Sequence, residues 1–177
     1  INEPTSFWVG GEHTVPDHLP VDWAGSGNTM AALHNVYAHL MARATREGLL
    51  DASEQRPFVL TRAGFAGQQR YTAMWTGDSP SNFPMMAANL PMMLGLGLSG
   101  VSHCGSDVGG FSGSPSPQLF ARWMQLGSIS PFFRGHVATG TPDQEPWSFT
   151  LEVEDISRTM ISSRYRLLPY HYSLFRE

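Results

Sequence analysis

The stretch RYTAMWTGDSP, residues 70–80, contains the pattern that decides the fold. A short apolar run, Arg70 to Trp75, predicts a buried β-strand, and a turn with Gly77 follows it. The residues after this turn have the apolar spacing of a helix from Met85 to Gly95, which Pro91 is expected to kink or delay. A strand, a polar loop and a helix therefore follow one another within one short segment.

The same succession of strand, loop and helix is predicted along the rest of the chain. Further strands are expected at Arg56–Arg62, Leu98–Cys104 and Ser128–Arg134. Further helices are expected at Asn28–Glu47, which Gly48 should end, from Ser116–Pro117 through Gly127, and at Glu152–Leu168. This alternation is typical of parallel α/β architecture, in which the buried strands are expected to be apolar runs.

Composition limits the class of protein. Of the 177 residues, 41% are hydrophobic and only 15% are charged, which is sparse charge for a free-standing domain. The formal net charge of -4, without a cluster of basic residues, argues against nucleic-acid binding. Cys104 is the only cysteine, which excludes an intrachain disulfide and a zinc site of several thiolates. No apolar run reaches the length of a membrane span, and the cellular compartment stays open.

Polar side chains gather in the loops after the predicted strands, where parallel α/β folds place their chemistry. Asp78, beside Trp75, has two interpretations: a general acid that keeps its proton in a partly apolar pocket, or the turn-favouring residue of a β-turn. His136 also has two, as a donor to substrate hydroxyls or as a member of a polar network. The tryptophans and phenylalanines near these loops either stack on a sugar ring or belong to the core.

The stretch HCGSDVGGF, residues 103–111, contains three residues of metal-binding type, His103, Cys104 and Asp107. Three mixed ligands on one loop, without a second cluster, are weak support for a metal site. The glycines do not have the G-x-G-x-x-G spacing of a dinucleotide-binding loop. The simpler interpretation is a tight loop whose glycines let the backbone approach a ligand or a neighbouring segment.

Taken together, four ordered motifs resemble glycoside hydrolase family 31, and most of all its α-glucosidases. The motifs are RPFVLTR (56–62), RYTAMWTGD (70–78), GVSHCGSDVGGF (100–111) and SPFFRGH (130–136). The resemblance extends from Ile1 to the predicted helix with RYRLLPYHY (164–172). It implies a retaining hydrolase that removes α-linked glucose from the ends of oligosaccharides or glycans and that needs no cofactor.

The resemblance also implies that residues 1–177 are the second half of a (β/α)8 barrel, with its strands five to eight. In the family, the catalytic nucleophile is the Asp of an Asp-Met-Asn-Glu-Pro-like motif, and Ile1–Pro4 is similar to the residues after that Asp. The chain would therefore begin just after the nucleophile and would need the remainder of the barrel as its partner. On this interpretation the isolated chain is expected to be inactive and to fold poorly.

The same resemblance implies a role for each candidate site residue. Asp78 would be the general acid/base of a pair of carboxyls that lie about 5–5.5 Å apart in a retaining glycosidase. The residues that would form the sugar subsite are Arg62, His136, Trp75, Asp107, Phe111 and Ile1. Arg62 and His136 would bind hydroxyls, Asp107 would hold the local network together, and the other three would form the walls of the pocket.

Several alternatives stay open on the same scaffold. Asn2-Glu3-Pro4 favours glucose over xylose, because the related α-xylosidases lack this sequence after the nucleophile. The segment SPSNFP, residues 79–84, differs from the charged and aromatic residues common there in the family, so contacts to the leaving group are not implied. A transglycosylase, an α-glucan lyase and an inactive carbohydrate-binding or regulatory homologue are the other possibilities. The presence of Arg62, Asp78 and His136 together argues against the inactive homologue.

Overall fold

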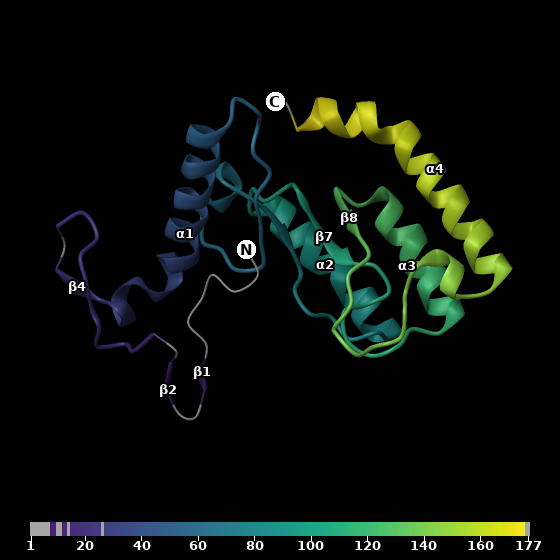
Figure 1. Ribbon diagram of the computed structural model, residues 1–177, viewed down its shortest axis with the longest axis horizontal. Coiled ribbons are helices and arrows are strands. Elements are labelled where there is room, and N and C mark those ends of the chain that lie inside the picture. The colour runs from purple at the N-terminus through teal and green to yellow at the C-terminus, as the bar shows by residue number, and fades with distance from the viewer. Residues whose placement is uncertain (1–7, 10–11, 14, 26, 176–177) are drawn as a thin grey trace. The chain divides into compact units, whose positions relative to one another are not determined.

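A computed structural model describes residues 8–9, 12–13, 15–25 and 27–175 of the chain (Figure 1). Ile1, which the sequence predicts as part of the sugar pocket, lies outside these residues. The chain divides into two compact units, residues 1–74 and residues 75–177, and each is described by itself.

In the described residues, the first unit begins with two short antiparallel hairpins, which a long helix follows. Strand β1 (Trp8–Val9) pairs with β2 (Glu12–His13), and β3 (Pro20–Val21) pairs with β4 (Asn28–Thr29). Helix α1 (Met30–Ala52) follows β4 directly. The sequence predicts neither hairpin, because strands of two residues are too short to show an alternating pattern.

Helix α1 confirms the helix predicted over Asn28–Glu47, but the predicted end at Gly48 is wrong. The helix continues to Ala52, and Ser53 is the first extended residue after it. Gly48 is exposed, and a Cβ atom there would meet no other atom within 4 Å. A glycine inside an exposed helix costs about 1 kcal/mol relative to alanine, which is too little to end a helix that its neighbours favour.

A four-stranded sheet has the order β5–β6–β7–β8, which is also the order of these strands along the chain. The strands are β5 (Leu60–Thr61), β6 (Ala73–Trp75), β7 (Cys104–Asp107) and β8 (Phe132–Arg134). The β5–β6 and β7–β8 pairs are parallel, with Asp107 opposite Arg134 at the end of the second pair. This arrangement confirms the predicted parallel α/β architecture.

The strands differ from the predicted ones in position and composition. Strands β5, β6 and β8 are confirmed, but each occupies only the C-terminal part of its predicted segment. The strand predicted over Leu98–Cys104 is wrong, because Leu98 ends a helix and β7 begins only at Cys104. A 3₁₀ helix, Gln68–Arg70, precedes β6 where the sequence predicts the start of that strand.

Strand β7 is completely buried although most of its residues are not hydrophobic. The expectation that buried strands are apolar runs is therefore wrong for this strand. Its polar side chains have partners instead: the indole N–H of Trp123 donates to Ser106 Oγ at 2.9 Å, and Asp107 forms an ion pair with Arg134. Buried polar groups are tolerated when they are paired in this way.

The second unit contains three helices, α2 (Phe83–Leu98), α3 (Pro117–Ile129) and α4 (Leu151–Leu174), with a 3₁₀ helix, Pro146–Ser148, before α4. The predicted start of α3 is confirmed, because Ser116 Oγ accepts a hydrogen bond from the N–H of Leu119. Helix α2 begins before Met85, with Asn82 as its cap, and Pro91 lies inside it without ending it. Helix α4 continues beyond the predicted end at Leu168.

Helix α3 packs between the β7–β8 pair and α4 (Figure 1). The core that results contains Val108, Leu119, Phe120, Ala121, Trp123, Met124 and Val153. Trp123 is completely buried, and its hydrogen bond to Ser106 fixes α3 against β7. This layer supports the carboxyl ends of β7 and β8 from the side of the helices.

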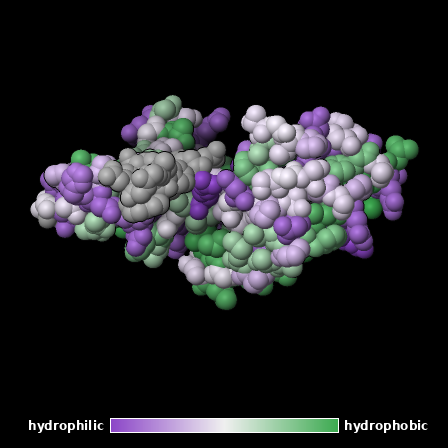
Figure 2. All heavy atoms as spheres, turned by 90° about the horizontal axis from the view of Figure 1, so that it is seen from below, coloured by the Kyte–Doolittle hydropathy of each residue, from purple (hydrophilic) through white to green (hydrophobic). Residues whose placement is uncertain are grey.

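Large hydrophobic side chains are also exposed on both α2 and α4. They include Leu90, Leu94 and Leu98 of α2, and Leu151, Tyr165, Tyr170 and Tyr172 of α4. On the face shown in Figure 2, hydrophobic residues in green lie among hydrophilic ones in purple. None of the helices in the described part of the chain is long and apolar enough to cross a bilayer.

Candidate active site

Three of the strands end in a side chain that takes part in one cluster: Trp75 ends β6, Asp107 ends β7 and Arg134 ends β8. Neighbouring parallel strands direct their carboxyl ends to the same edge of the sheet, where α/β folds place their ligands. Asp107 is the residue opposite Arg134 in the β7–β8 pair. The strand register therefore brings the carboxylate of Asp107 and the guanidinium of Arg134 side by side.

Asp107 and Arg134 form a buried ion pair. The Nε and Nη2 atoms of Arg134 lie 2.9 and 2.7 Å from Asp107 Oδ1, and the Asp107 side chain is completely inaccessible to solvent. Asp107 Oδ2 is buried as well and has no hydrogen-bond partner among the described residues. Burial raises the pKa of Asp107, whereas the hydrogen bonds and charge of Arg134 lower it; the effect of burial is larger.

The guanidinium of Arg134 also lies over two aromatic rings. Its central carbon is 4.9 Å from the ring centre of Trp75 and 5.3 Å from that of Phe132. A guanidinium at this distance from an indole face is a favourable cation–π contact. Trp75 is almost completely buried, so within the described residues its ring is covered by Arg134 on this face.

Asp78 is the central residue of a three-residue turn that follows β6. The N–H of Ser79 donates to the carbonyl oxygen of Gly77 at 2.9 Å, which is tighter than the β-turn considered from the sequence. Gly77 and Ser79 are buried, but Asp78 between them is exposed. Within the described residues Asp78 is therefore an exposed residue of a tight turn, and its environment in a complete barrel stays a prediction.

Main-chain hydrogen bonds join the three loops that follow β6, β7 and β8. The N–H of Phe111 donates to the carbonyl oxygen of Ser79 at 2.7 Å, and the N–H of Ala138 donates to that of Phe111 at 2.9 Å. Phe111 thus connects the turn of Asp78 with the loop of His136. The rings of Phe111 and His136 also lie together, with their centres 5.2 Å apart.

The structure thus brings together five of the sequence-predicted site residues within the second unit. The charges of His136 and Asp78 both act on Asp107, in opposite directions: His136 lowers the pKa of Asp107 and Asp78 raises it. Arg62 belongs to the first unit, where it directly follows β5 and is half-buried.

Comparison with known proteins gives the family of the chain. Residues 1–174 match the family model described as "Glycosyl hydrolases family 31 TIM-barrel domain". The chain belongs to glycosyl hydrolase family 31. The resemblance found in the four sequence motifs is therefore confirmed, and so is the assignment of the four parallel strands to an α/β barrel.

Curated relatives of this family 31 chain are much longer than the chain itself. Alpha-glucosidase 2 of Bacillus thermoamyloliquefaciens is 45% identical over 178 residues, which cover 100% of this chain and 22% of the relative. Neutral alpha-glucosidase C of Homo sapiens is 48% identical over 178 residues, which cover 99% of this chain and 19% of the relative. The chain thus spans about a fifth of the length of these relatives.

Solved structures of the family have the same fold over most of the chain. The crystal structure of a family 31 alpha-glucosidase from Bacteroides thetaiotaomicron matches with a TM-score of 0.78 and 45% sequence identity. The match covers 89% of this chain and 27% of that chain.

Within this family 31 domain, His103, Cys104 and Asp107 do not converge as metal ligands. Cys104 and Asp107 are buried in β7, and His103 stacks on Phe175 with ring centres 4.2 Å apart. In the part of the chain that the structure describes, no three side chains of His, Cys, Asp or Glu form a group that could hold a metal ion.

Sequence reasoning missed the role of Arg134 and of the serines around the Asp78 turn. The sequence predicts Arg134 only as the last residue of a strand, although it is the partner of Asp107. A buried acid at the end of one strand requires a cation nearby, and a register count along the neighbouring strand could have found it. For Ser79 and Ser112 the sequence contains no comparable signal, because their contribution is made by main-chain atoms.

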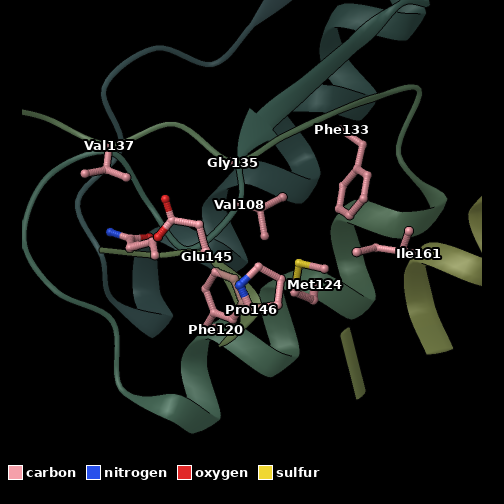
Figure 3. A pocket seen from close by; sticks show the side chains of 10 residues that line it. Val108, Phe120, Met124, Phe133, Gly135, Val137, Glu145, Pro146 and Ile161 are labelled. Carbon is pink, nitrogen blue, oxygen red and sulfur yellow. The ribbon is translucent and has the colours of Figure 1, made fainter. Parts of the chain in front are cut away.

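A separate cavity of about 260 Å³ lies under the connection between β8 and α4 (Figure 3). Its apolar lining includes Val108, Phe120, Met124, Phe133, Pro146 and Ile161. Successive residues of a strand point to opposite faces, so Phe133 faces the helices while its neighbour Arg134 points away from them. None of the sequence-predicted site residues lines this cavity.

Proposed function

We propose that the chain is the part of a retaining α-glucosidase that carries its general acid/base, Asp78. The observation that carries this proposal is that Asp78 is an exposed residue of the turn directly after β6 and that its charge acts on Asp107, the partner of Arg134. The names of the relatives, which are alpha-glucosidases, support the same activity. The substrate would be an α-glucoside oligosaccharide or glycan with glucose at its non-reducing end.

Two carboxyls are needed for this reaction. In the first step, Asp78 would give its proton to the glycosidic oxygen while a carboxylate attacks the anomeric carbon, so that the bond to the leaving group breaks. In the second step, Asp78 would take a proton from water, and that water would release glucose from the carboxylate with retained configuration. The attacking carboxylate would be the Asp that the family has immediately before the residues similar to Ile1–Pro4.

The remaining site residues would bind and orient the sugar. Arg62 and His136 would donate hydrogen bonds to its hydroxyls, and Phe111 would support the ring of His136, with which it is in contact. Asp107 would fix Arg134 and thereby Trp75, since Arg134 contacts both. Ile1, outside the described residues, would complete the apolar wall.

We further propose that residues 1–177 are strands five to eight of the catalytic barrel and that the rest of the barrel is supplied by a longer protein. The order β5–β6–β7–β8 fits consecutive barrel strands. The relatives are about five times as long as the matched segment, as the 19% and 22% coverage shows. Exposed apolar residues on α2 and α4 fit surfaces that further domains would cover.

The activity is tested on the full-length protein with maltose and related α-linked disaccharides. Proton NMR of the first product should show α-glucose before mutarotation, which is the outcome of a retaining hydrolase. Initial release of β-glucose, transfer to a second sugar as the main product, or an unsaturated anhydro sugar would each contradict the proposal. The absence of any turnover would support the inactive homologue instead.

The role of Asp78 is tested by Asp78→Asn in the same protein. Turnover of disaccharides should fall by on the order of 10²–10⁴, the usual contribution of general acid–base catalysis. Glucosides whose leaving group needs no proton, such as α-glucosyl fluoride, should lose much less in the glycosylation step. An equal loss on both kinds of substrate in that step would show that Asp78 is not the acid.

A further inference from the structure

We infer that Gly110 is a positioning residue for Asp78: the loop after β7 holds the Asp78 turn in place through a close contact that only glycine allows. This inference rests on the proposed role of Asp78 as acid/base. It concerns the segment 76–82, which carries Asp78, and the segment 108–116, which connects β7 to α3.

The two segments are joined along their main chains. The carbonyl oxygen of Ser79 accepts hydrogen bonds from the N–H groups of Phe111 at 2.7 Å and Ser112 at 3.3 Å. In return, the N–H of Ser81 donates to the carbonyl oxygen of Ser112 at 2.8 Å, and Pro80 forms a parallel bridge with Ser112. The residue next to Asp78 is therefore held by the segment after β7.

Gly110 lies directly against this junction. A Cβ atom at Gly110 would lie 2.7 Å from the Cα of Ser81 and 2.8 Å from its backbone nitrogen. Contacts with carbon and nitrogen at this distance are not tolerated, and backbone atoms cannot rotate away as a side chain can. Any side chain at residue 110 must therefore push the two segments apart, which lengthens the hydrogen bonds to Ser79.

On its other side, the Asp78 turn is held by α2. Asn89 is completely buried, and its Nδ2 atom donates to Ser79 Oγ at 3.4 Å and to the carbonyl oxygen of Met85 at 3.0 Å. Ser79 itself is only 3% exposed. Because Ser79 is fixed from two sides, separation of the loops would displace or rotate the turn, and with it the carboxyl of Asp78.

The chain offers two matched controls in the same segment. Gly109 and Gly113 both have φ of +91°, close to the +88° of Gly110, so alanine strains the backbone similarly at all three. At Gly109 the atoms nearest to a Cβ would belong to the side chains of Gln144 and Phe120, and not to the segment 76–82 that carries Asp78. At Gly113 the atom nearest to a Cβ would be the Cβ of Ser81 at 3.8 Å, which is an ordinary contact.

The experiment compares Gly110→Ala, Gly109→Ala and Gly113→Ala in the full-length protein, with Asp78→Asn as the reference. For each variant, kcat/KM is measured on maltose and on α-glucosyl fluoride, and the amount of folded protein is measured by active-site titration or calorimetry. The informative quantity is the kcat/KM value on maltose divided by the kcat/KM value on α-glucosyl fluoride. A loss of folded protein lowers both values equally and leaves this ratio unchanged.

Gly110→Ala should lower this ratio at least about tenfold, in the same direction as Asp78→Asn, since a misplacement of 1 Å can cost on the order of 10²-fold. Gly109→Ala and Gly113→Ala should leave the ratio within about twofold of the original protein, even if Gly109→Ala reduces stability. If Asp78→Asn changes the ratio and Gly110→Ala does not, the inference is wrong and the proposed function stands. If Asp78→Asn leaves the ratio unchanged, the proposed function itself fails.

Discussion

Both hydrogen bonds from Arg134 to Asp107 end on the same carboxylate oxygen, Oδ1, while Oδ2 is buried without a partner among the described residues. A carboxylate can accept from a guanidinium with both oxygens, and this pair uses only one. The second oxygen thus keeps its acceptor capacity at the strand edge, where the sugar is proposed to bind. The ion pair therefore engages one of the two carboxylate oxygens of Asp107 and leaves the other without a bond from Arg134.

Asp107→Asn should destabilise the domain by about 3 kcal/mol, because it leaves the charge of Arg134 without its partner in a mostly buried position. The double variant Asp107→Asn/Arg134→Met should recover part of this loss, since no unpaired charge stays behind. The measurement is the free energy of unfolding of the two single variants and the double variant. Strictly additive single effects would contradict a direct energetic coupling between the two side chains.

Arg62→Lys and His136→Gln should lower kcat/KM on maltose without changing its ratio to the value on α-glucosyl fluoride by more than about threefold. The physical reason is that both residues are proposed to bind hydroxyls of the glucose ring, which the two substrates share. Steady-state kinetics on both substrates checks this prediction. A ratio that falls as far as in Asp78→Asn would assign proton transfer, and not sugar binding, to the residue concerned.

Arg164 should anchor α4 to the connection between α3 and β8. Its guanidinium donates to three carbonyl oxygens, of Ser128 at 3.1 Å, Ser130 at 2.5 Å and Pro131 at 2.7 Å. Arg164→Lys should cost on the order of 1.5–3 kcal/mol, because a lysine is charged but cannot direct a planar fork at three acceptors.

Hydrogen exchange of the peptides from α4 is the measurement for Arg164→Lys, and Arg158→Lys is the matched control. Arg158 lies on the same helix and forms an exposed pair with Glu154, which is worth little to stability. Faster exchange in Arg164→Lys than in Arg158→Lys is expected. Equal exchange in the two variants would remove the anchoring role.

The C-terminal part of α4 should become less stable in mild acid. Burial and the charge of Arg164 lower the pKa of both His103 and His171 from the ordinary value of 6.5. Below pH 6.5 the unfolded segment therefore binds protons more readily than the folded one. The stability of the segment decreases as the pH falls, until the pH reaches the lowered pKa values of the two histidines in the folded protein. Above pH 6.5 this contribution is fully present.

The variant His103→Phe separates titration from packing. It keeps a ring against Phe175, on which His103 stacks, but it cannot bind a proton. Hydrogen exchange of α4, corrected for the intrinsic effect of pH, should depend less steeply on pH in this variant than in the original protein. An unchanged steepness between pH 7.5 and 5.5 would mean that His103 does not cause the effect.

The extent to which sequence predicted this domain differs between its helices, its strands and its site. The start of α3 at Ser116–Pro117 is a local signal, carried by a cap and a proline, and the structure confirms it. The position of β7 was missed because Leu98 and Val101 are more hydrophobic than the strand itself. In β7, burial depends on Trp123 and Arg134, which are distant in sequence, so a local pattern could not reveal it.

The site residues illustrate the same limit. The motifs placed Asp78, Asp107 and His136 after strands, and this part of the prediction follows from the fold class. Sequence could not show that Asp78 is exposed between buried neighbours, or that Arg134 covers Trp75, because both depend on how loops from different strands meet. The contacts that decide these points are made by backbone atoms and by residues more than twenty-five positions apart, such as Asp107 and Arg134, for which the sequence separation is 27.

The main-chain bonds that join Phe111 to both Ser79 and Ala138 have a consequence for engineering and for evolution. The three loops of the candidate site share one hydrogen-bonded frame, so exchanging one of them for a loop with a different backbone course should disturb the other two. Grafts that change substrate preference should succeed only when the three segments are transplanted as a set, or when the exchange spares the backbone around Phe111. Natural diversification of this site would then proceed by coordinated changes in all three loops.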